Sequence, residues 1–437
     1  MELATRKFLL NEIKKDILEN EKEIINALGK DLGKGEFEAV VAEVQYVLSE
    51  IDNILKKLHK WVKPKKVSTP LVHWPAKSFI HYEPFGNILV VAPWNYPFQL
   101  AVSPSVGAIA AGNTVVIKPS ELASETEKVI LNIFSKEKYS KYIEVVTGGV
   151  PETTELLNRR FDYIFYTGST QVGKVIMSAA AKNLTPVTLE LGGKSPAVVY
   201  SDSDLRVSAR RIAWGKCMNA GQTCIAPDYV LVEKKVKKDF LKLIVEEIKK
   251  FYGENQIQSN DYGRIINRSH FERLSALLPN KVYFGGNKDE KSLKISPTIV
   301  EAQLNDDLME SEIFGPILPV LEFEKTSEVI SIVKGKEKPL ALYVFSKDED
   351  NQNEILENLS YGGGVINDTL IHIANGNLPF GGVGSSGVGS YHGKHSFETF
   401  SHKKSIIRRS FRFDLALRYP PYLGKLRVIR WLLKYIG

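Results

Sequence analysis

The sequence predicts an α/β fold of two or three domains, two of which contain mainly parallel strands. The chain has 437 residues, which is more than one hydrophobic core usually accommodates. Short β-branched runs alternate with stretches of helical periodicity in two separate parts of the chain, and such alternation indicates βαβ units. The composition, with 43% hydrophobic and 25% charged residues, is typical of soluble globular proteins.

A helical region is expected first and a set of strands after it. In residues 5–60, apolar positions recur at three- and four-residue spacing, and Gly33 and Gly35 interrupt the pattern. The prolines of residues 64–75 break this periodicity. Strands and helices then alternate, and the stretch LAVSPSVGAIAAG suits a helix that ends in glycine. The expected strands of this first set are residues 77–86, 87–93, 113–119, 141–146 and 163–166.

A second alternating set occupies the later part of the chain. It begins at residues 196–200 and contains a long amphipathic helix, KKDFLKLIVEEIKKFYG, at residues 237–253. Its other expected strands are residues 230–234, 341–346 and 363–368. This pattern predicts a second α/β domain.

Cysteine content and hydropathy restrict the setting of the protein. The two cysteines, Cys217 and Cys224, match neither a disulfide framework nor a CxxC metal site. We therefore expect a reducing, cytoplasmic location and no metal. No apolar run has the length needed to span a membrane. The N-terminal residues mix acidic and basic side chains into a helical pattern, which favours a helix over a signal peptide.

The positive charge is concentrated at the C-terminus. Residues 401–437 contain ten Lys or Arg residues and one Asp, whereas the rest of the chain is nearly neutral. This distribution disfavours a nucleic-acid-binding face on the main body. In residues 422–437 a stripe of Arg427, Arg430 and Lys434 faces a broad apolar side. Such a tail either contacts the inner face of a membrane peripherally or packs against the other subunit of a dimer.

A phosphate-binding turn is expected in residues 163–181, which have the order strand, glycine turn, helix. The turn lets backbone amides approach a phosphate, and the helix N-terminus adds partial positive charge. A P-loop is one alternative, but Val175 stands where a P-loop has the Ser or Thr that holds magnesium. The string GVGSSG at 382–387 fits GxGxxG, yet no βαβ unit follows it, so a loop is favoured.

Polar residues near the expected strands are further candidates. Lys118 and Glu121 follow a strand at the sheet edge where ligands bind, and two solvated loop charges are the alternative. Glu190 lies in an apolar run before two glycines, as either a general base with a raised pKa or a paired structural carboxylate. Asn95, between aromatic residues and prolines, either caps a turn or donates its amide to a developing oxyanion.

Cys224 is the candidate nucleophile. A lone cysteine is commonly a small buried hydrophobe. Here the sequence GQTC places a glycine nearby, which allows close approach, and no continuous core strand follows the cysteine. A thiol with backbone donors, an amide and a carboxylate at hand is suited to acyl chemistry through a thiolate.

Seven motifs in a fixed order connect these candidates. They are APWNYPF, IKPSE, YTGSTQVG, LELGGKSP, GQTC, EIFGP and LPFGGVGSSGVG, between residues 92 and 389. In this order the chain resembles the aldehyde dehydrogenase superfamily. The strings PETTELL, GKCMNAGQTCIAPDYV, SYHGKHSFETFSH and RYPPY resemble its class 3 branch, which includes fatty and aromatic aldehyde dehydrogenases. The resemblance covers nearly the whole chain, up to about residue 422.

The resemblance implies a role for each motif residue. Cys224 matches the nucleophile, Glu190 the general base and Asn95 the residue that binds the oxyanion. The implied reaction is NAD(P)-dependent oxidation of medium- or long-chain aliphatic or aromatic aldehydes to acids, through a thiohemiacetal and a thioester. An acylating enzyme that passes the acyl group to coenzyme A is the enzymatic alternative, and Glu190 argues against it. A membrane-peripheral or structural homologue is the alternative from another class.

The resemblance also implies a cofactor site. Lys118 and Glu121 match residues at the adenosine ribose, and Glu312 and Phe314 match residues at the nicotinamide ribose. The turn beneath the pyrophosphate corresponds to Gly168, Ser169, Val172 and Gly173. Because Glu121 would repel a 2′-phosphate, NAD is the expected cofactor and NADP is the alternative.

A three-part division of the chain follows from the resemblance. Residues 1–63 and 85–190 are expected to form a Rossmann-like NAD-binding domain, and residues 191–400 an α/β catalytic domain. Residues 64–84 and 401–421 are expected to form a small β element for oligomerisation, in a homodimer, and residues 422–437 the basic tail.

Overall fold

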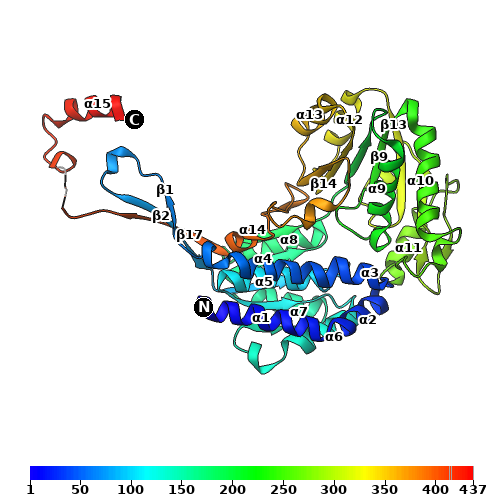
Figure 1. Cartoon of the computed structure of the whole chain (residues 1–437), viewed down its shortest axis with the longest axis horizontal. Helices are drawn as coiled ribbons and strands as arrows, with labels where there is room; N and C mark the ends of the chain where they lie inside the picture. Colours follow the sequence, from blue (N-terminus) through cyan, green and yellow to red (C-terminus); the bar gives the residue numbers. More distant parts are fainter. Residues whose placement is uncertain (413, 415, 437) are drawn as a thin grey trace.

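The computed structural model describes residues 1–412, 414 and 416–436, without the side chains of residues 432, 433, 435 and 436. Figure 1 shows two lobes and an arm that leaves the lower lobe. The predicted tail and β element extend over residues 413, 415 and 437, which lie outside the described residues. Leu432, Leu433 and Ile436 belong to the expected apolar side of the tail, and their side chains also lie outside the described part of the chain.

Helices form the N-terminal region, as the periodicity predicts. Gly33, with a φ of 63°, ends the second helix in a left-handed conformation, a common glycine-dependent way to end a helix. A short π-helix, η1, links the third and fourth helices. The elements are α1 (Leu3–Glu19), α2 (Glu21–Leu32), α3 (Glu36–Ala39), η1 (Val40–Val44) and α4 (Gln45–Trp61).

The first sheet has the strand order β16-β7-β6-β3-β4-β5. Strands β3 to β7 are parallel to one another, and β16 pairs antiparallel with β7. The strands are β3 (Asn87–Val91), β4 (Thr114–Lys118), β5 (Ile143–Val145), β6 (Tyr163–Thr167), β7 (Val187–Glu190) and β16 (Gly387–Val388). The helices between them are α5 (Gln99–Ala111), α6 (Ser124–Phe134), α7 (Val150–Asn158) and α8 (Thr170–Ala181).

Helices cover both faces of this sheet. Alternate residues of a strand point to opposite faces, and β3 follows this rule. Ile88 and Val90 pack in the core that contains the N-terminal helices and α5. Leu89 and Val91 pack in a separate core with α7 and α8. The first lobe is therefore a doubly wound α/β layer structure.

The second sheet has six parallel strands in the order β12-β13-β9-β8-β14-β15. Its strands are β8 (Pro196–Val199), β9 (Tyr229–Glu233), β12 (Thr298–Glu301), β13 (Ile317–Phe323), β14 (Ala341–Phe345) and β15 (Gly363–Ile366). In Figure 1 α9 (Leu205–Cys217) and α10 (Lys237–Tyr252) lie on one side, and α12 (Thr326–Lys334) and α13 (Glu349–Asn358) on the other. Sequence reasoning did not predict β12 and β13, although β13 is an apolar run.

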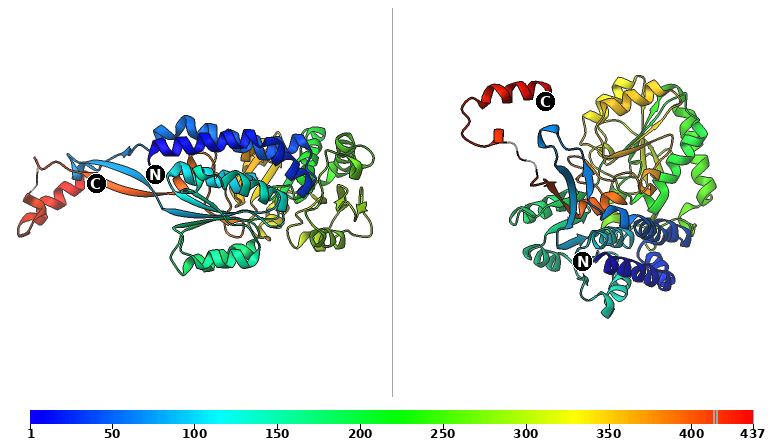
Figure 2. Two further views of the ribbon diagram at one scale, coloured as in Figure 1. Left: turned by 90° about the horizontal axis from the view of Figure 1, so that it is seen from below. Right: turned by 60° about the vertical axis from the view of Figure 1, so that its left-hand side comes forward.

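The arm is a three-stranded antiparallel sheet in the order β1-β2-β17. It joins β1 (Lys65–Val67) and β2 (Lys77–Pro84) to β17 (Ser401–Arg408). Beyond the arm, α15 (Lys425–Ile436) stands away from both lobes in every view (Figures 1 and 2). Among the described residues, no helix combines the length and hydropathy needed to cross a bilayer.

One predicted boundary is wrong. Residues 387–400 were expected in the second α/β unit, but β16 pairs with β7 of the first sheet. The following helix, α14 (Lys394–Thr399), packs on α5 of the same lobe. A glycine permits this return, because a Cβ at Gly387 would lie 2.3 Å from the backbone oxygen of Leu189.

Candidate active site

The candidate residues meet where the edges of the two sheets face one another. The parallel strands β3, β4, β6 and β7 run directly into the segments that carry Asn95, Lys118, Gly168 and Glu190. Open α/β sheets bind ligands at this carboxyl edge. In the second sheet the candidate residue lies at the opposite end of its strand, because Cys224 comes before β9 and not after it.

A cavity of about 180 Å³ lies at this junction and contains both Cys224 and Glu190. Its walls are mostly apolar or aromatic, and Val41 and Trp214 are partly exposed at its surface. The other lining residues are Ala42, Tyr46, Tyr96, Gln99, Leu100, Thr167, Met218, Thr223, Ile225, Leu370, Ile371, Ile373, Ala374, Phe380 and Tyr391. The cavity thus combines a thiol and a carboxyl group with an apolar lining.

The backbone before Cys224 has an unusual conformation. Asn219 and Ala220 have φ values of 52° and 51°, in the left-handed region that such residues rarely occupy. Gly221 approaches another segment closely, since a Cβ there would lie 2.2 Å from the backbone oxygen of Gly315. The glycine of GQTC therefore has the close-approach role that its position predicts.

Gln222 fixes this loop from within. Its side chain is fully buried and donates to the backbone oxygens of Asn219, at 3.0 Å, and Arg264, at 2.9 Å. Its Oε1 accepts from the backbone N–H of Ile266 at 3.0 Å. A buried amide with all these bonds made fixes the loop in a single arrangement.

The two cysteines have different environments. Cys217 is buried in the core, whereas Cys224 is half-buried and lines the cavity. Burial, and then the negative charges of Glu312 and Glu190, raise the pKa of the Cys224 thiol to about 12. The thiol therefore needs a base or a nearby positive charge before it becomes a nucleophile.

Glu190 ends β7 and is only 2% exposed. Neither of its carboxyl oxygens has a hydrogen-bond partner within the described part of the chain. Burial raises its pKa well above the usual value. A carboxyl group that is buried, unpaired and open to a cavity is equipped to exchange a proton there.

Asn95 is buried on the segment that follows β3. Its Nδ2 donates to the backbone oxygen of Gln222 at 3.0 Å, two residues before Cys224. Its backbone oxygen accepts from Asn219 Nδ2 at 2.8 Å. Because an amide nitrogen carries two hydrogens, Asn95 retains one donor for another group.

Glu312 lies in the loop before β13 and is held near the same junction. Burial is the main cause that raises its pKa to about 8. The loop is anchored by Asp228, which accepts from the backbone N–H of Ile313 at 3.1 Å and from Lys194 Nζ at 2.7 Å. Phe314 has a φ of 49°, and its ring meets that of Trp94 edge-on at 5.4 Å.

Lys118 and Glu121 lie at the end of β4. Lys118 is buried, its Nζ donates to the backbone oxygen of Pro119 at 2.6 Å, and burial lowers its pKa. Its Nζ is 3.9 Å from a carboxylate oxygen of Glu121, whose side chain is 44% exposed. The pair is not two solvated charges, because one member is buried.

The turn before α8 fits a phosphate of a dinucleotide. A Cβ at Gly168 would lie 2.2 Å from the hydroxyl of Tyr166, so only glycine fits. Ser169 caps the helix by accepting from the Val172 N–H at 3.3 Å, and Val172 is exposed. A glycine turn that runs into a helix N-terminus is an arrangement suited to binding a phosphate.

Gly173, also expected at the cofactor, lies in the first turns of α8. It is buried, and a Cβ there would lie 2.7 Å from Leu191 Cδ2. Its N–H donates to the Ser169 oxygen within the helix. The absence of a Cβ at Gly173 therefore lets α8 approach Leu191 closely.

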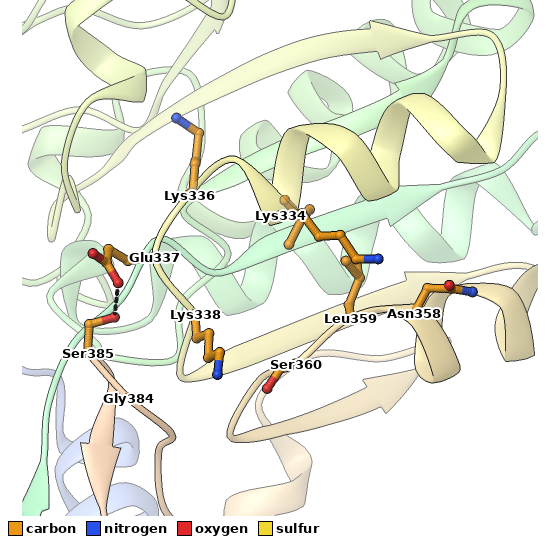
Figure 3. Close-up of a pocket in the computed structure, with 10 residues that line it drawn as sticks. Lys334, Lys336, Glu337, Lys338, Asn358, Leu359, Ser360, Gly384 and Ser385 are labelled. Carbon is orange, nitrogen blue, oxygen red and sulfur yellow. Dashed lines mark hydrogen bonds between the residues drawn. The ribbon is translucent and has the colours of Figure 1, made fainter.

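A second hollow, of about 480 Å³, lies beside α12 and is larger than the cavity at Cys224. Its lining includes Lys334, Lys336 and Lys338, but Figure 3 shows that their side chains point in different directions. Ser385 donates to a carboxylate oxygen of Glu337 at 2.8 Å. The hollow lacks convergent groups, so we assign the chemistry to the smaller cavity.

Several contributors to the site were not singled out from the sequence. Tyr96, Trp214 and Tyr391 line the cavity, and Asp228 with Lys194 supports the loop of Glu312. For Lys194 and Asp228, the available signal was a charged residue inside an apolar motif. The cavity aromatics carry no such signal, because aromatic residues are common in any core.

Comparison with known proteins identifies the family. Residues 1–406 match the aldehyde dehydrogenase family. The chain belongs to this family. The enzyme is therefore an NAD(P)-dependent oxidoreductase that acts on aldehydes, as the ordered motifs predict.

Individual relatives support the same assignment over nearly the full length. The 4,4′-diaponeurosporen-aldehyde dehydrogenase of Staphylococcus aureus is 47% identical, covering 98% of this chain and 94% of its own length. The dimeric NADP-preferring aldehyde dehydrogenase of Rattus norvegicus is 48% identical, and the match covers 95% of this chain and 93% of that protein. The aldehyde dehydrogenase family 3 member A2 of Pongo abelii is 47% identical, and the match covers 94% of this chain and 86% of that protein. The predicted class 3 affiliation is confirmed.

A solved structure has the same fold. The substrate-bound state of Staphylococcus aureus AldH superposes with a TM-score of 0.96 at 46% sequence identity, covering 99% of this chain and 95% of that chain. The predicted aldehyde dehydrogenase fold is therefore confirmed.

Proposed function

We propose that the enzyme oxidises aldehydes through a covalent intermediate on Cys224. The observation that carries this proposal is the shared cavity, in which the thiol of Cys224 and the unpaired carboxyl group of Glu190 open onto one apolar space. The Cys224 thiol first loses its proton, and the thiolate sulfur then attacks the aldehyde carbon and forms a thiohemiacetal oxyanion. The Asn95 amide and the Cys224 N–H donate to the oxyanion, and each donor contributes about 3–4 kcal/mol of transition-state stabilisation.

A bound dinucleotide would supply the acceptor for the hydride that the thiohemiacetal loses. We propose that Lys118 and Glu121 hold its adenosine ribose, Gly168, Ser169 and Val172 its pyrophosphate, and Glu312 and Phe314 its nicotinamide ribose. Loss of the hydride leaves an acyl group bound to the Cys224 sulfur as a thioester. Glu190 takes a proton from water, and the resulting hydroxide hydrolyses the thioester to the acid.

The cavity supports an apolar substrate of medium or long chain, aliphatic or aromatic. Its aliphatic and aromatic lining extends from Cys224 to the partly exposed side chains of Val41 and Trp214. Each methylene group that leaves water contributes about 0.8 kcal/mol. A chain that reaches from the thiol to the cavity mouth therefore binds more tightly than a short aldehyde.

The test is NADH formation, followed spectrophotometrically with aldehydes of increasing chain length. We expect kcat/KM to rise with chain length until the cavity is filled, and then to level off. Trp214→Ala, which shortens the apolar wall, should reduce the gain for long chains and leave short ones nearly unchanged. A kcat/KM that is independent of chain length in both proteins would contradict the assignment of the cavity.

We also propose that two copies associate through the arm. Its edge strands β1 and β17 are unpaired on their outer sides, and Leu71, Val72 and Ile407 are exposed. The rat relative carries the word dimeric in its name. Light scattering should give the mass of a dimer for the natural chain and of a monomer for Ile407→Glu.

For the tail we propose packing on the partner subunit. The exposed Leu426 and Val428 belong to α15, which stands beside the arm and away from both lobes (Figure 1). Peripheral membrane contact is the alternative, and it predicts that anionic liposomes pellet the full chain but not a chain without residues 422–437. Equal recovery of both chains in the supernatant is expected.

The free thiols of Cys217 and Cys224 favour a reducing, cytoplasmic location.

A further inference from the structure

A buried ion pair lies beneath the segment that carries Asn95. Lys34 follows α2, and Glu43 belongs to the π-helix η1. Both side chains are fully buried, and the ammonium of Lys34 donates to Glu43 Oε1. Neither residue lines the cavity, and the proposed reaction does not use either one directly.

The ammonium group holds one end of the segment. Lys34 Nζ donates to the backbone oxygen of Asn95 at 3.0 Å. The same nitrogen lies 4.0 Å from the centre of the Tyr96 ring, which is the geometry of a cation–π contact. The positive charge is therefore in contact with two successive residues.

The carboxylate holds the other end. Glu43 Oε2 accepts from the backbone N–H groups of Phe98, at 3.1 Å, and Gln99, at 2.8 Å. The helix α5 begins at Gln99, and the first N–H groups of a helix have no partner within it. A carboxylate at that position satisfies these donors and is stabilised by the helix dipole.

The opposite side of the segment faces the loop of the nucleophile. Asn95 donates to the backbone oxygen of Gln222, and the Tyr96 hydroxyl is 2.8 Å from Thr223 Oγ1. Thr223 directly precedes Cys224. A shift of the backbone at residues 95–96 would therefore move the amide relative to the sulfur.

Stability alone does not account for such a pair. Replacing a buried ion pair by uncharged residues of similar shape is often neutral or stabilising, whereas removing one partner is strongly destabilising. We propose that Lys34 and Glu43 are a positioning pair that holds the Asn95 amide where the oxyanion forms. This inference rests on the proposed role of Asn95.

The experiment uses the neutral double variant Lys34→Met/Glu43→Gln in the full chain. It removes both charges of the pair, and the Gln oxygen still accepts from the start of α5. We expect a Tm close to that of the natural enzyme and a kcat for aldehyde oxidation about 10- to 100-fold lower, because small displacements of a reacting group have effects of this size. The KM for the cofactor should not change. Glu43→Gln alone should lower both Tm and kcat.

Two comparisons separate positioning from general loss of structure. In an Asn95→Ala background the same double substitution should lower kcat by less than twofold, because no amide remains to be positioned. Asp16→Asn is the matched control: Asp16 is a buried carboxylate of α1 that pairs with Lys136 and Tyr139, remote from the cavity. It should lower Tm and leave kcat unchanged.

The outcomes distinguish this inference from the function on which it rests. If Asn95→Ala keeps full kcat, the proposed role of Asn95 is wrong and the inference is overturned with it. If Asn95→Ala is impaired but the double variant keeps full kcat, only the inference is overturned. The inference would also be overturned if the losses of kcat from Asn95→Ala and from the double substitution added up in the triple variant. The ion pair would then act independently of the Asn95 amide.

Discussion

The proposed reacting end of the site and its proposed adenosine end differ in how their side chains are held. At the reacting end Glu190 is buried, and Asn95 and Gln222 are tied into neighbouring backbone by hydrogen bonds. At the proposed adenosine end Lys118 is buried, but its partner Glu121 is 44% exposed and lies 3.9 Å away. Buried groups at fixed positions determine rates, whereas solvated groups contribute small differences in binding. Substitutions at the two ends should therefore affect different kinetic constants.

The largest effect is expected at the sulfur. Cys224→Ala should reduce NAD-dependent aldehyde oxidation by about four orders of magnitude or more, because Cys224 carries the only thiol among the described residues that line the cavity. Cys217→Ala is the matched control and should retain activity, since Cys217 packs in the core. Steady-state assays of both purified variants give the result. Comparable activity in the two would remove Cys224 from the mechanism.

The next largest effect is expected at Glu190. Glu190→Gln keeps the shape of the side chain but cannot accept a proton, so thioester hydrolysis should slow by about 10²- to 10⁴-fold. The first turnover should still form NADH, which gives a burst followed by a slow phase in stopped-flow absorbance. Mass spectrometry should then detect an acylated chain. Unchanged turnover without a burst would refute the assignment of Glu190 as the base.

A smaller effect is expected from pH. Both Cys224 and Glu190 must lose a proton, and the pKa of each is raised above its usual value, to about 12 for Cys224. The active forms therefore become more populated as pH rises, and kcat/KM should increase from pH 6 to pH 9 by up to about tenfold per unit. A pH–rate profile in constant ionic strength tests this. A profile that falls with rising pH would contradict the expected sign.

The smallest effect is expected at the adenosine end. Glu121→Gln removes a negative charge that is partly exposed, so kcat/KM for NADP should rise about fivefold, the size expected of a solvated charge interaction. The kcat with NAD should stay nearly constant. Parallel assays with NAD and NADP measure the ratio. A large fall of kcat in this variant would mean that the two ends are not as independent as their contacts indicate.

Much of the fold followed from local patterns. β-branched runs that end at proline or glycine gave strands such as β3 and β4, and their alternation with helices gave parallel sheets. The return of residues 387–400 to the first lobe was not predictable, because β16 has two residues and no periodicity can be recognised in so short a strand. Only tertiary packing decides where such a segment pairs.

For the site, motif order identified residues that the structure brings to one junction, including Cys224 and Glu190. The left-handed backbone at Asn219 and Ala220 could not be predicted, since Asn adopts this conformation only occasionally and Ala rarely does. The Lys34–Glu43 pair was equally hidden. A lysine and a glutamate nine residues apart look like solvated charges until folding buries them together.

The arm has a consequence for biosynthesis. Its third strand, β17, pairs with β2, and Ser401 lies opposite Pro84 in this register. A ribosome releases residues 65–84 long before residue 401 is made, so β2 keeps an open edge until β17 has been translated. Nascent chains and products truncated before residue 401 would present that edge to one another. The proposed association through the arm therefore requires chains that contain β17.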